Sequence, residues 1–247
     1  MEAWKALTEA LSTLEEGIQR LTVQVGRPLY IQDGNKVPYR YPPSSQHVQF
    51  LYAVRVVSGL NSCVSLLASG YVQETGVLLR TIDEFIMIIM FIEEAHISGS
   101  PNEAQKKFVE GFFSEKRESM ETLQEHKKSG GHVPRKKMHA SEGRLMGEFA
   151  EPAETQASVR MVYDTLSEYV HGSHLIIMEM YDPQKERFRL QGMLGTPRIE
   201  GSSNQLAIYR HRALNTIAIL SRRWNDEQFA DVLRQTGKDL EASSEYA

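Results

Sequence analysis

The sequence predicts an all-α protein, a single-domain bundle of about six or seven helices with a short β-hairpin near residues 180–192. Three observations support this prediction. Apolar residues recur every three or four positions over long stretches of the chain. Ser, Asn or Asp stands where several of these stretches begin, and Gly or Pro stands where several end. No internal repeat or clean linker divides the chain, so one domain is the simplest interpretation.

The N-terminal part combines a helix with an irregular segment. Residues 2–23 have apolar side chains at helical spacing, which predicts the first helix. Residues 27–43 contain four prolines and an Asp33-Gly34 turn, which favours a loop with a short hairpin. We interpret residues 1–43 as a helix and loop packed on a bundle core formed by residues 44–238.

The remaining helices are located by their capping residues. Ser44 or Ser45, Asn102 and Asp226 are suited to accept hydrogen bonds from a first helical turn. Ser203-Asn204 has the same character. The segment Ser98-Gly99-Ser100-Pro101 ends the third predicted helix, just before Asn102. The predicted helices cover about residues 44–70, 72–96, 102–128 and 154–171, a sixth begins at Ser203-Asn204, and a seventh runs from Asp226 to about Lys238.

Three further segments have no predicted helix. Asp182-Pro183 is a turn signal, and residues 187–190 alternate like a short exposed strand, which together predict the hairpin. Residues 127–143 are rich in Lys, Gly, His and Arg and are predicted to form an exposed basic loop. The chain from Glu241 to Ala247 is polar, and residues 239–247 are predicted to form a flexible tail.

Composition excludes several classes of protein. Lys and Arg total 28 and Asp and Glu total 32, a formal net charge of -4 that excludes a basic, histone-like nucleic-acid binder and leaves room for a local basic patch. The single cysteine, Cys63, excludes an internal disulfide and is predicted to be a small buried side chain. The most apolar run, Phe85–Ile92, is far shorter than the roughly 20 residues that span a bilayer. Because no signal-peptide pattern opens the sequence either, we expect a cytoplasmic protein without a membrane contact.

The third predicted helix carries charges on an otherwise apolar surface. Arg80, Asp83 and Glu84 share one face, where Arg80 can pair with either carboxylate. A buried charge without a partner costs roughly several kcal/mol, so these residues must be paired or line a polar cleft. Two interpretations stay open: an ion pair that fixes the helix register, or a functional pocket.

The fifth predicted helix offers candidate partners for this cluster. Its polar stripe ends at His171, directly before Gly172, and a helix C-terminus favours a protonated imidazole. His171 could therefore act as an acid or base near neutral pH, with Tyr169 as a hydroxyl donor. The alternative is that both side chains only hydrogen-bond helix ends. The candidate catalytic residues are His171, Arg80, Glu84 and Tyr169.

No cofactor or metal is predicted. His171 and His174 have a spacing that suits two ligands of one metal, but Gly172 interrupts the helix between them. Phosphate-loop, zinc-protease and nucleophile-elbow motifs do not occur in the sequence. On the sixth predicted helix, Tyr209-Arg210-His211-Arg212 forms a cationic cluster that could touch phosphate, although a solvated face is the more common role.

Two short motifs carry a resemblance to a known family. Leu78–Glu84 contains Leu-x-Arg-x-x-x-Glu, and Leu166–Ser173 contains Ser-x-Tyr-x-His-Gly. In these motifs the chain resembles a bacterial domain family of unknown function, over roughly residues 45–225. The resemblance implies an all-helical fold and supplies no activity.

A looser similarity is to the helical HEPN class, whose members include metal-independent ribonucleases of toxin and antiphage systems. Their signature is Arg, four to six residues and His on one helix. Here the spacing occurs only between Arg40 and His47, across Pro42-Pro43. The similarity implies that His171 would be the general acid or base, that Arg80 would stabilise phosphate charge and that Tyr169 would position RNA.

The sequence leaves three functions open. The first is a cytoplasmic bacterial interaction or self-association protein, in a defence or toxin-type system, with a homo-oligomer or another protein as partner and with the Arg80/Glu84/His171 cluster holding the fold. The second is the RNA-cleaving effector. The third is small-ligand sensing by the same cluster. A cleft that joins Arg80 and His171 to solvent would favour the enzyme, and a sealed cluster would favour the interaction protein.

Overall fold

The computed structural model describes residues 2–30, 39–113, 138, 140–141, 144–145 and 152–244. These residues form eight helices and two short antiparallel strand pairs, which confirms the all-α prediction and the hairpin after residue 180. The helices are α1 (Glu2–Val25), α2 (Ser45–Ala68), α3 (Val72–Ile97), α4 (Glu103–Phe113), α7 (Pro152–His171), α8 (His174–Met178), α9 (Arg198–Arg223) and α10 (Glu227–Ser244). Strands β1 (Leu29–Tyr30) and β2 (Tyr39–Arg40) pair, as do β3 (Tyr181–Asp182) and β4 (Arg187–Phe188).

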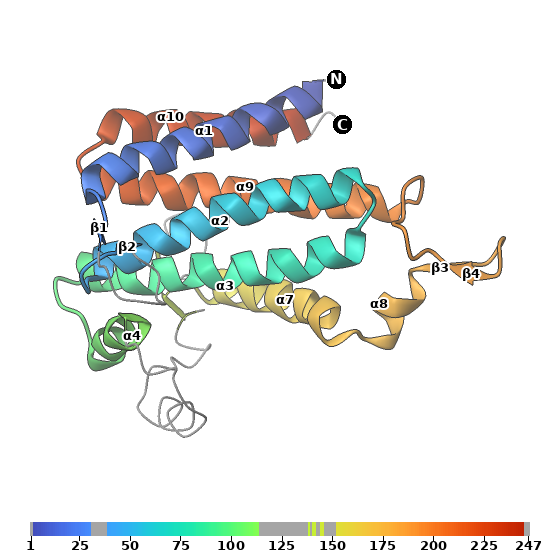
Figure 1. Cartoon of the computed structure of the whole chain (residues 1–247), viewed down its shortest axis with the longest axis horizontal. Helices are drawn as coiled ribbons and strands as arrows, with labels where there is room; N and C mark the ends of the chain where they lie inside the picture. The colour runs from blue at the N-terminus through green and yellow to red at the C-terminus, as the bar shows by residue number, and fades with distance from the viewer. Residues whose placement is uncertain are drawn as a thin grey trace.

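The long helices lie roughly parallel to one axis in successive layers (Figure 1). Helices α1 and α10 lie side by side and cover α2 and α9, which in turn lie against α3. Helix α7 packs on the far side of α3, and α4 lies near the C-terminal end of α3 (Figure 1). At the opposite end, α8 and the β3–β4 hairpin project from the bundle (Figure 1).

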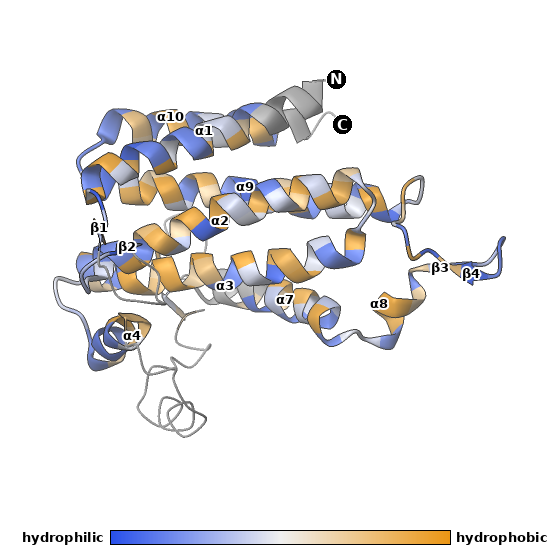
Figure 2. Cartoon of the chain, viewed as in Figure 1, coloured by the Kyte–Doolittle hydropathy of each residue, from blue (hydrophilic) through white to orange (hydrophobic). Residues whose placement is uncertain are grey.

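The core lies where the long helices meet, because their apolar faces turn inward (Figure 2). Leu14, Leu60, Leu79 and Ile217, from four different helices, are all fully buried. Each such side chain contributes about 1.5–3 kcal/mol through removal of apolar surface from water. Helix α3 contacts α2, α7 and α9. Its sequence is apolar on nearly every side because these helices cover it on several sides.

Three predicted caps are confirmed. The Ser44 hydroxyl accepts from the His47 backbone N–H at 3.1 Å and begins α2. The Asn102 carboxamide oxygen accepts from the N–H groups of Ala104 and Gln105, each at 3.0 Å, before α4. The Asp226 carboxylate accepts from the Phe229 N–H at 3.3 Å before α10. Hydrogen bonds from the first turn to these polar N-cap residues therefore set where the three helices begin.

Two predicted boundaries are wrong. Helix α9 begins at Arg198 rather than at Ser203-Asn204, because the Ser203 hydroxyl donates to the Ile199 carbonyl within the helix instead of capping it. Helix α10 continues to Ser244, so residues 239–244 are helical where a flexible tail is predicted. The reason is Leu240, which is buried in the core and holds the last turns against the bundle.

Some predictions lie outside the described residues. They are the end of the fourth helix beyond Phe113, the Asp33-Gly34 turn and most of the basic segment 127–143.

Within the described chain, α2 is the one helix whose length and composition would allow it to cross a membrane. In its most apolar window, 44% of the residues are buried inside the bundle, where α2 contacts α1, α3 and α9. The central helix of a soluble bundle has the same properties, and the position of α2 is compatible with that role.

Candidate functional site

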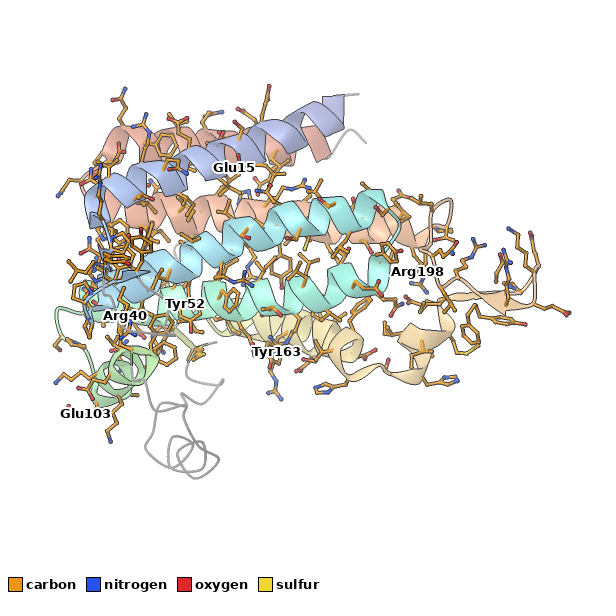
Figure 3. The ribbon with its side chains drawn as sticks, in the orientation of Figure 1. Glu15, Arg40, Tyr52, Glu103, Tyr163 and Arg198 are labelled. Atoms are coloured by element: carbon orange, nitrogen blue, oxygen red, sulfur yellow. The ribbon has the colours of Figure 1, made fainter. Side chains whose placement is uncertain are left out.

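Arg80 joins α3 to α7. Its guanidinium carbon lies 3.5 Å from the ring centroid of Tyr163, and its Nε donates to the Ser167 hydroxyl at 3.2 Å. Its Nη2 forms an ion pair with Glu84 at 2.8 Å, one turn further along α3. The Arg80 side chain is only 7% exposed, whereas that of Glu84 is 40% exposed. Tyr163 lies at the junction of the two helices (Figure 3), so this cluster is a closed contact between α3 and α7.

Asp83 belongs to a different contact. Its carboxylate accepts from the Tyr209 hydroxyl at 2.8 Å and pairs with Arg212 at 2.6 Å, both on α9. The prediction that Arg80 can pair with either carboxylate is therefore wrong for Asp83. Neighbouring positions on a helix are about 100° apart, which turns Asp83 toward α9 and Glu84 away from it.

Tyr169 packs against α3 at a second point. A Cβ added at Gly76 would lie 2.5 Å from the Tyr169 ring, so the two helices approach closely here. Burial raises the pKa of the Tyr169 phenol, and the nearby Glu179 carboxylate raises it further. Glu179 pairs with Arg198 at 3.0 Å at the end of the bundle that carries α8 (Figure 3).

His171 stays outside these contacts. Its side chain is exposed, and it forms no hydrogen bond or ion pair with any residue in the described part of the chain. Gly172 adopts a φ of 60° and ends α7 as predicted. The structure thus brings Arg80 and Glu84 together, places Tyr169 near Glu179 and Arg198, and leaves His171 in solvent.

The geometry does not assemble a catalytic centre from the four predicted residues. Arg80 is stacked on Tyr163 and bonded on two sides, so its charge serves the contact between two helices. Among the described residues, no group of three or more His, Cys, Asp or Glu side chains is arranged to hold a metal ion. His174 is exposed on α8.

A polar network that the sequence analysis missed joins α2, α3 and α9. Arg223 donates to Gln49 at 2.6 Å, to Glu93 at 2.7 Å and to His96 Nε2 at 2.7 Å. We call these four residues the clasp. Burial lowers the pKa of His96, and the Arg223 charge lowers it further, while Glu93 opposes the change. The signal in the sequence was the spacing of Glu93, which continues the buried series Ile82, Ile86 and Ile89.

The interpretation of Tyr209–Arg212 as a solvated cationic face is wrong. Tyr209 and Arg210 are buried, and the Arg212 side chain is 14% exposed. Among the residues that the structure describes, none offers a hydrogen bond to any of the three nitrogens of the Arg210 guanidinium. Burial lowers the pKa of Arg210 to about 10, and the electrostatic interaction with Cys63 acts in the opposite direction. The missed signal is again periodicity, because Arg210 lies four residues after the buried Leu206 and three before the buried Ala213.

Cys63 is a buried small side chain, as predicted. It is fully inaccessible to solvent, and burial raises its pKa to about 12. A thiol in this state is a poor nucleophile, so Cys63 is part of the packing.

Comparisons with protein-family models, with curated proteins and with solved structures gave no match to this chain.

Proposed function

We propose that this chain is a helical-bundle interaction protein that binds a second copy of itself. The contact is the α8 surface, which we define as Val170 at the end of α7, Leu175, Ile177 and Met178 on α8, and Leu190 after β4. A bacterial source, a cytoplasmic location and a role in a defence or toxin-type system belong to the same proposal. The resemblance of the two short motifs supports the bacterial source, and the looser HEPN similarity supports the defence or toxin-type role. The single cysteine, which allows no internal disulfide, is consistent with a cytoplasmic location.

One observation carries the proposal. Helix α8 has four consecutive apolar residues, and the bundle buries only Ile176. Leu175 is 72% exposed, Ile177 47% and Met178 42%. Single exposed apolar side chains are ordinary, but a group of them on one projecting element is typical of a contact surface.

Neighbouring side chains extend this group. Val170 is 48% exposed and Leu190 is 76% exposed. Both belong to the end of the bundle where α8 and the hairpin project, and the apolar character of α8 is visible there (Figure 2). Burial of these side chains in a partner would contribute roughly 25 cal/mol for each Å² of apolar area removed from water.

The charges around the α8 surface favour a second copy as the partner. Glu168 is exposed at the end of α7, and Lys185 and Arg187 are exposed on the hairpin. In a two-fold symmetric contact, an acidic side of one copy faces a basic side of the other, so a surface with both signs is complementary to itself.

The described residues give no support to RNA cleavage. That function needs His171 and Arg80 to reach one phosphate, whereas Arg80 is enclosed between α3 and α7 and His171 does not contact it. The buried Arg80 guanidinium, paired with the partly exposed Glu84, supports the interpretation in which this cluster holds the fold.

The test is the mass of the full-length chain in solution. Light scattering at about 100 μM, a concentration that detects contacts of micromolar affinity, is expected to give twice the chain mass of 28.1 kDa. The variant Leu175→Glu is expected to give the single-chain mass, because it places a charge in the apolar contact.

The matched control is Val23→Glu, since Val23 is 80% exposed on α1 and lies away from α8. This variant should keep the double mass. A wild-type chain that stays at 28.1 kDa, or a control that dissociates as readily as the α8 variant, would overturn the proposal.

A further inference from the structure

A cavity of about 260 Å³ lies between the C-terminal part of α3 and α4. It is at the end of the bundle opposite to α8 (Figure 1) and therefore does not belong to the α8 surface. Its apolar lining comes from Ile92, Ala95, Pro101 and Val109. Pockets for drug-sized ligands typically measure about 300–1,000 Å³, so this cavity suits a smaller molecule with an apolar body.

His96 is an exposed residue in the lining of this cavity, and its ring can offer a hydrogen-bond donor. Its Nε2 accepts from Arg223 at 2.7 Å, and an arginine can only donate, so the neutral ring carries its proton on Nδ1. The Ser45 hydroxyl lies 3.2 Å from the same Nε2 and reinforces this arrangement. The Nδ1–H group has no hydrogen-bond partner among the described residues.

Lys106 adds a positive charge to the same lining. Its ammonium group pairs with Glu103 at 3.3 Å, but both side chains are more than half exposed, and such pairs are worth little. Glu93 accepts from Gln49 and Arg223 through Oε2 and is not part of the cavity lining. The one acidic side chain of the lining, Glu110, is exposed.

We propose that this cavity binds a small carboxylic acid with an apolar body. The carboxylate accepts from His96 Nδ1–H and pairs with Lys106, and the aliphatic or aromatic body lies against Ile92, Ala95 and Val109. The clasp orients the imidazole through Arg223, so the donor is fixed before the ligand arrives.

The experiment titrates the full-length chain with hexanoate and, separately, with hexan-1-ol, followed by calorimetry or amide chemical shifts. Hexanoate is expected to saturate and to bind about tenfold more tightly than the alcohol, because only the acid uses the two donors. Equal affinity for the two probes, or no saturation by hexanoate, would overturn the proposal.

Paired lysine variants locate the site. Lys106→Met is expected to weaken hexanoate binding several-fold. Lys107→Met is the matched control, since Lys107 is exposed on the same helix and does not line the cavity, and it should leave binding unchanged. Equal effects of the two substitutions would contradict the assignment to this cavity.

Two further variants test the ligand class and the position of its body. Glu110→Gln is expected to tighten hexanoate binding, because it removes a like charge from the lining, and weaker binding would contradict a carboxylate ligand. Val109→Trp fills the cavity and should abolish binding of both probes in a variant whose circular dichroism matches that of the wild type. Retained binding in that variant would place the ligand elsewhere.

Discussion

Arg210 holds a positive charge in the core, and within the described part of the chain its three guanidinium nitrogens have no hydrogen-bond partner. The folded chain disfavours its charged form, which is why burial lowers its pKa to about 10 from 12.5. The cost of burying the charged guanidinium is present at neutral pH, because Arg210 is protonated there in both the folded and the unfolded chain. Stability recovers only as the pH rises from about 10 toward 12.5, where the unfolded chain binds more protons than the folded one.

We predict that Arg210→Met stabilises the protein. A methionine of similar length keeps the packing and removes the desolvation cost, so the free energy of unfolding should rise by about 1–4 kcal/mol. Urea unfolding at pH 7 measures the change. Arg55→Met is the control at an exposed arginine, and it should change stability by less than about 0.5 kcal/mol. A large loss of stability in the Arg210 variant would show that the charge has a partner in solution.

Single residues also show where sequence reasoning reached its limit. The spacing of Arg80 and Glu84 on one helix predicts their ion pair, because this spacing is local information. Whether Asp83 faces α7 or α9 depends on which helices surround α3, and this is a property of the tertiary structure. Arg210 and Glu93 each lie in a periodic series of buried positions, and this pattern predicts their burial. It conflicts with the general tendency of charged side chains to face solvent.

At the scale of elements, the contact between α3 and α7 depends on a missing side chain. Gly76 lets the Tyr169 ring approach the α3 backbone, and Arg80 joins the same two helices one turn further along. The predicted helices 72–96 and 154–171 agree with α3 and α7 within a few residues, but their pairing could not be predicted because nothing local in the sequence specifies which helix lies against Gly76.

We predict that Gly76→Ala destabilises the protein by about 1–3 kcal/mol, because the new methyl group overlaps the Tyr169 ring. Gly201→Ala is the matched control in α9, where a Cβ meets nothing within 4 Å. That variant should gain about 0.5–1 kcal/mol from the higher helix propensity of alanine. Thermal unfolding measures both changes.

A double-mutant cycle identifies the cause. In a Tyr169→Ala background, Gly76→Ala should cost little, since the overlapping ring is gone. An unchanged cost in that background would mean that Gly76 is needed for a reason other than its contact with α7.

At the scale of the whole molecule, the clasp makes stability depend on pH. Its histidine, His96, has a pKa below the ordinary value of 6.5 in the folded chain, chiefly through burial. As the pH falls below 6.5, the unfolded chain binds the proton first, so the folded state loses stability; above 6.5 the contribution is fully present. Glu94 acts in a separate window, because Arg144 lowers its pKa from 4.5 and its contribution is lost only under more acidic conditions.

We predict that the wild type is less stable at pH 5.5 than at pH 7.5, and that His96→Gln reduces this difference. The glutamine oxygen can accept from Arg223 at either pH and does not titrate in this range. Urea unfolding midpoints of both proteins at the two pH values provide the measurement. Identical pH responses would assign the titration to another group.

Cys63 has a practical consequence for studying this protein. Its thiol is buried and resists ionisation, so Cys63 in the native chain should react very slowly with maleimides and disulfide reagents. Cysteines introduced on the surface could then be labelled selectively without removal of the natural one. The slow rate at which Cys63 itself is modified would then report how often the core opens.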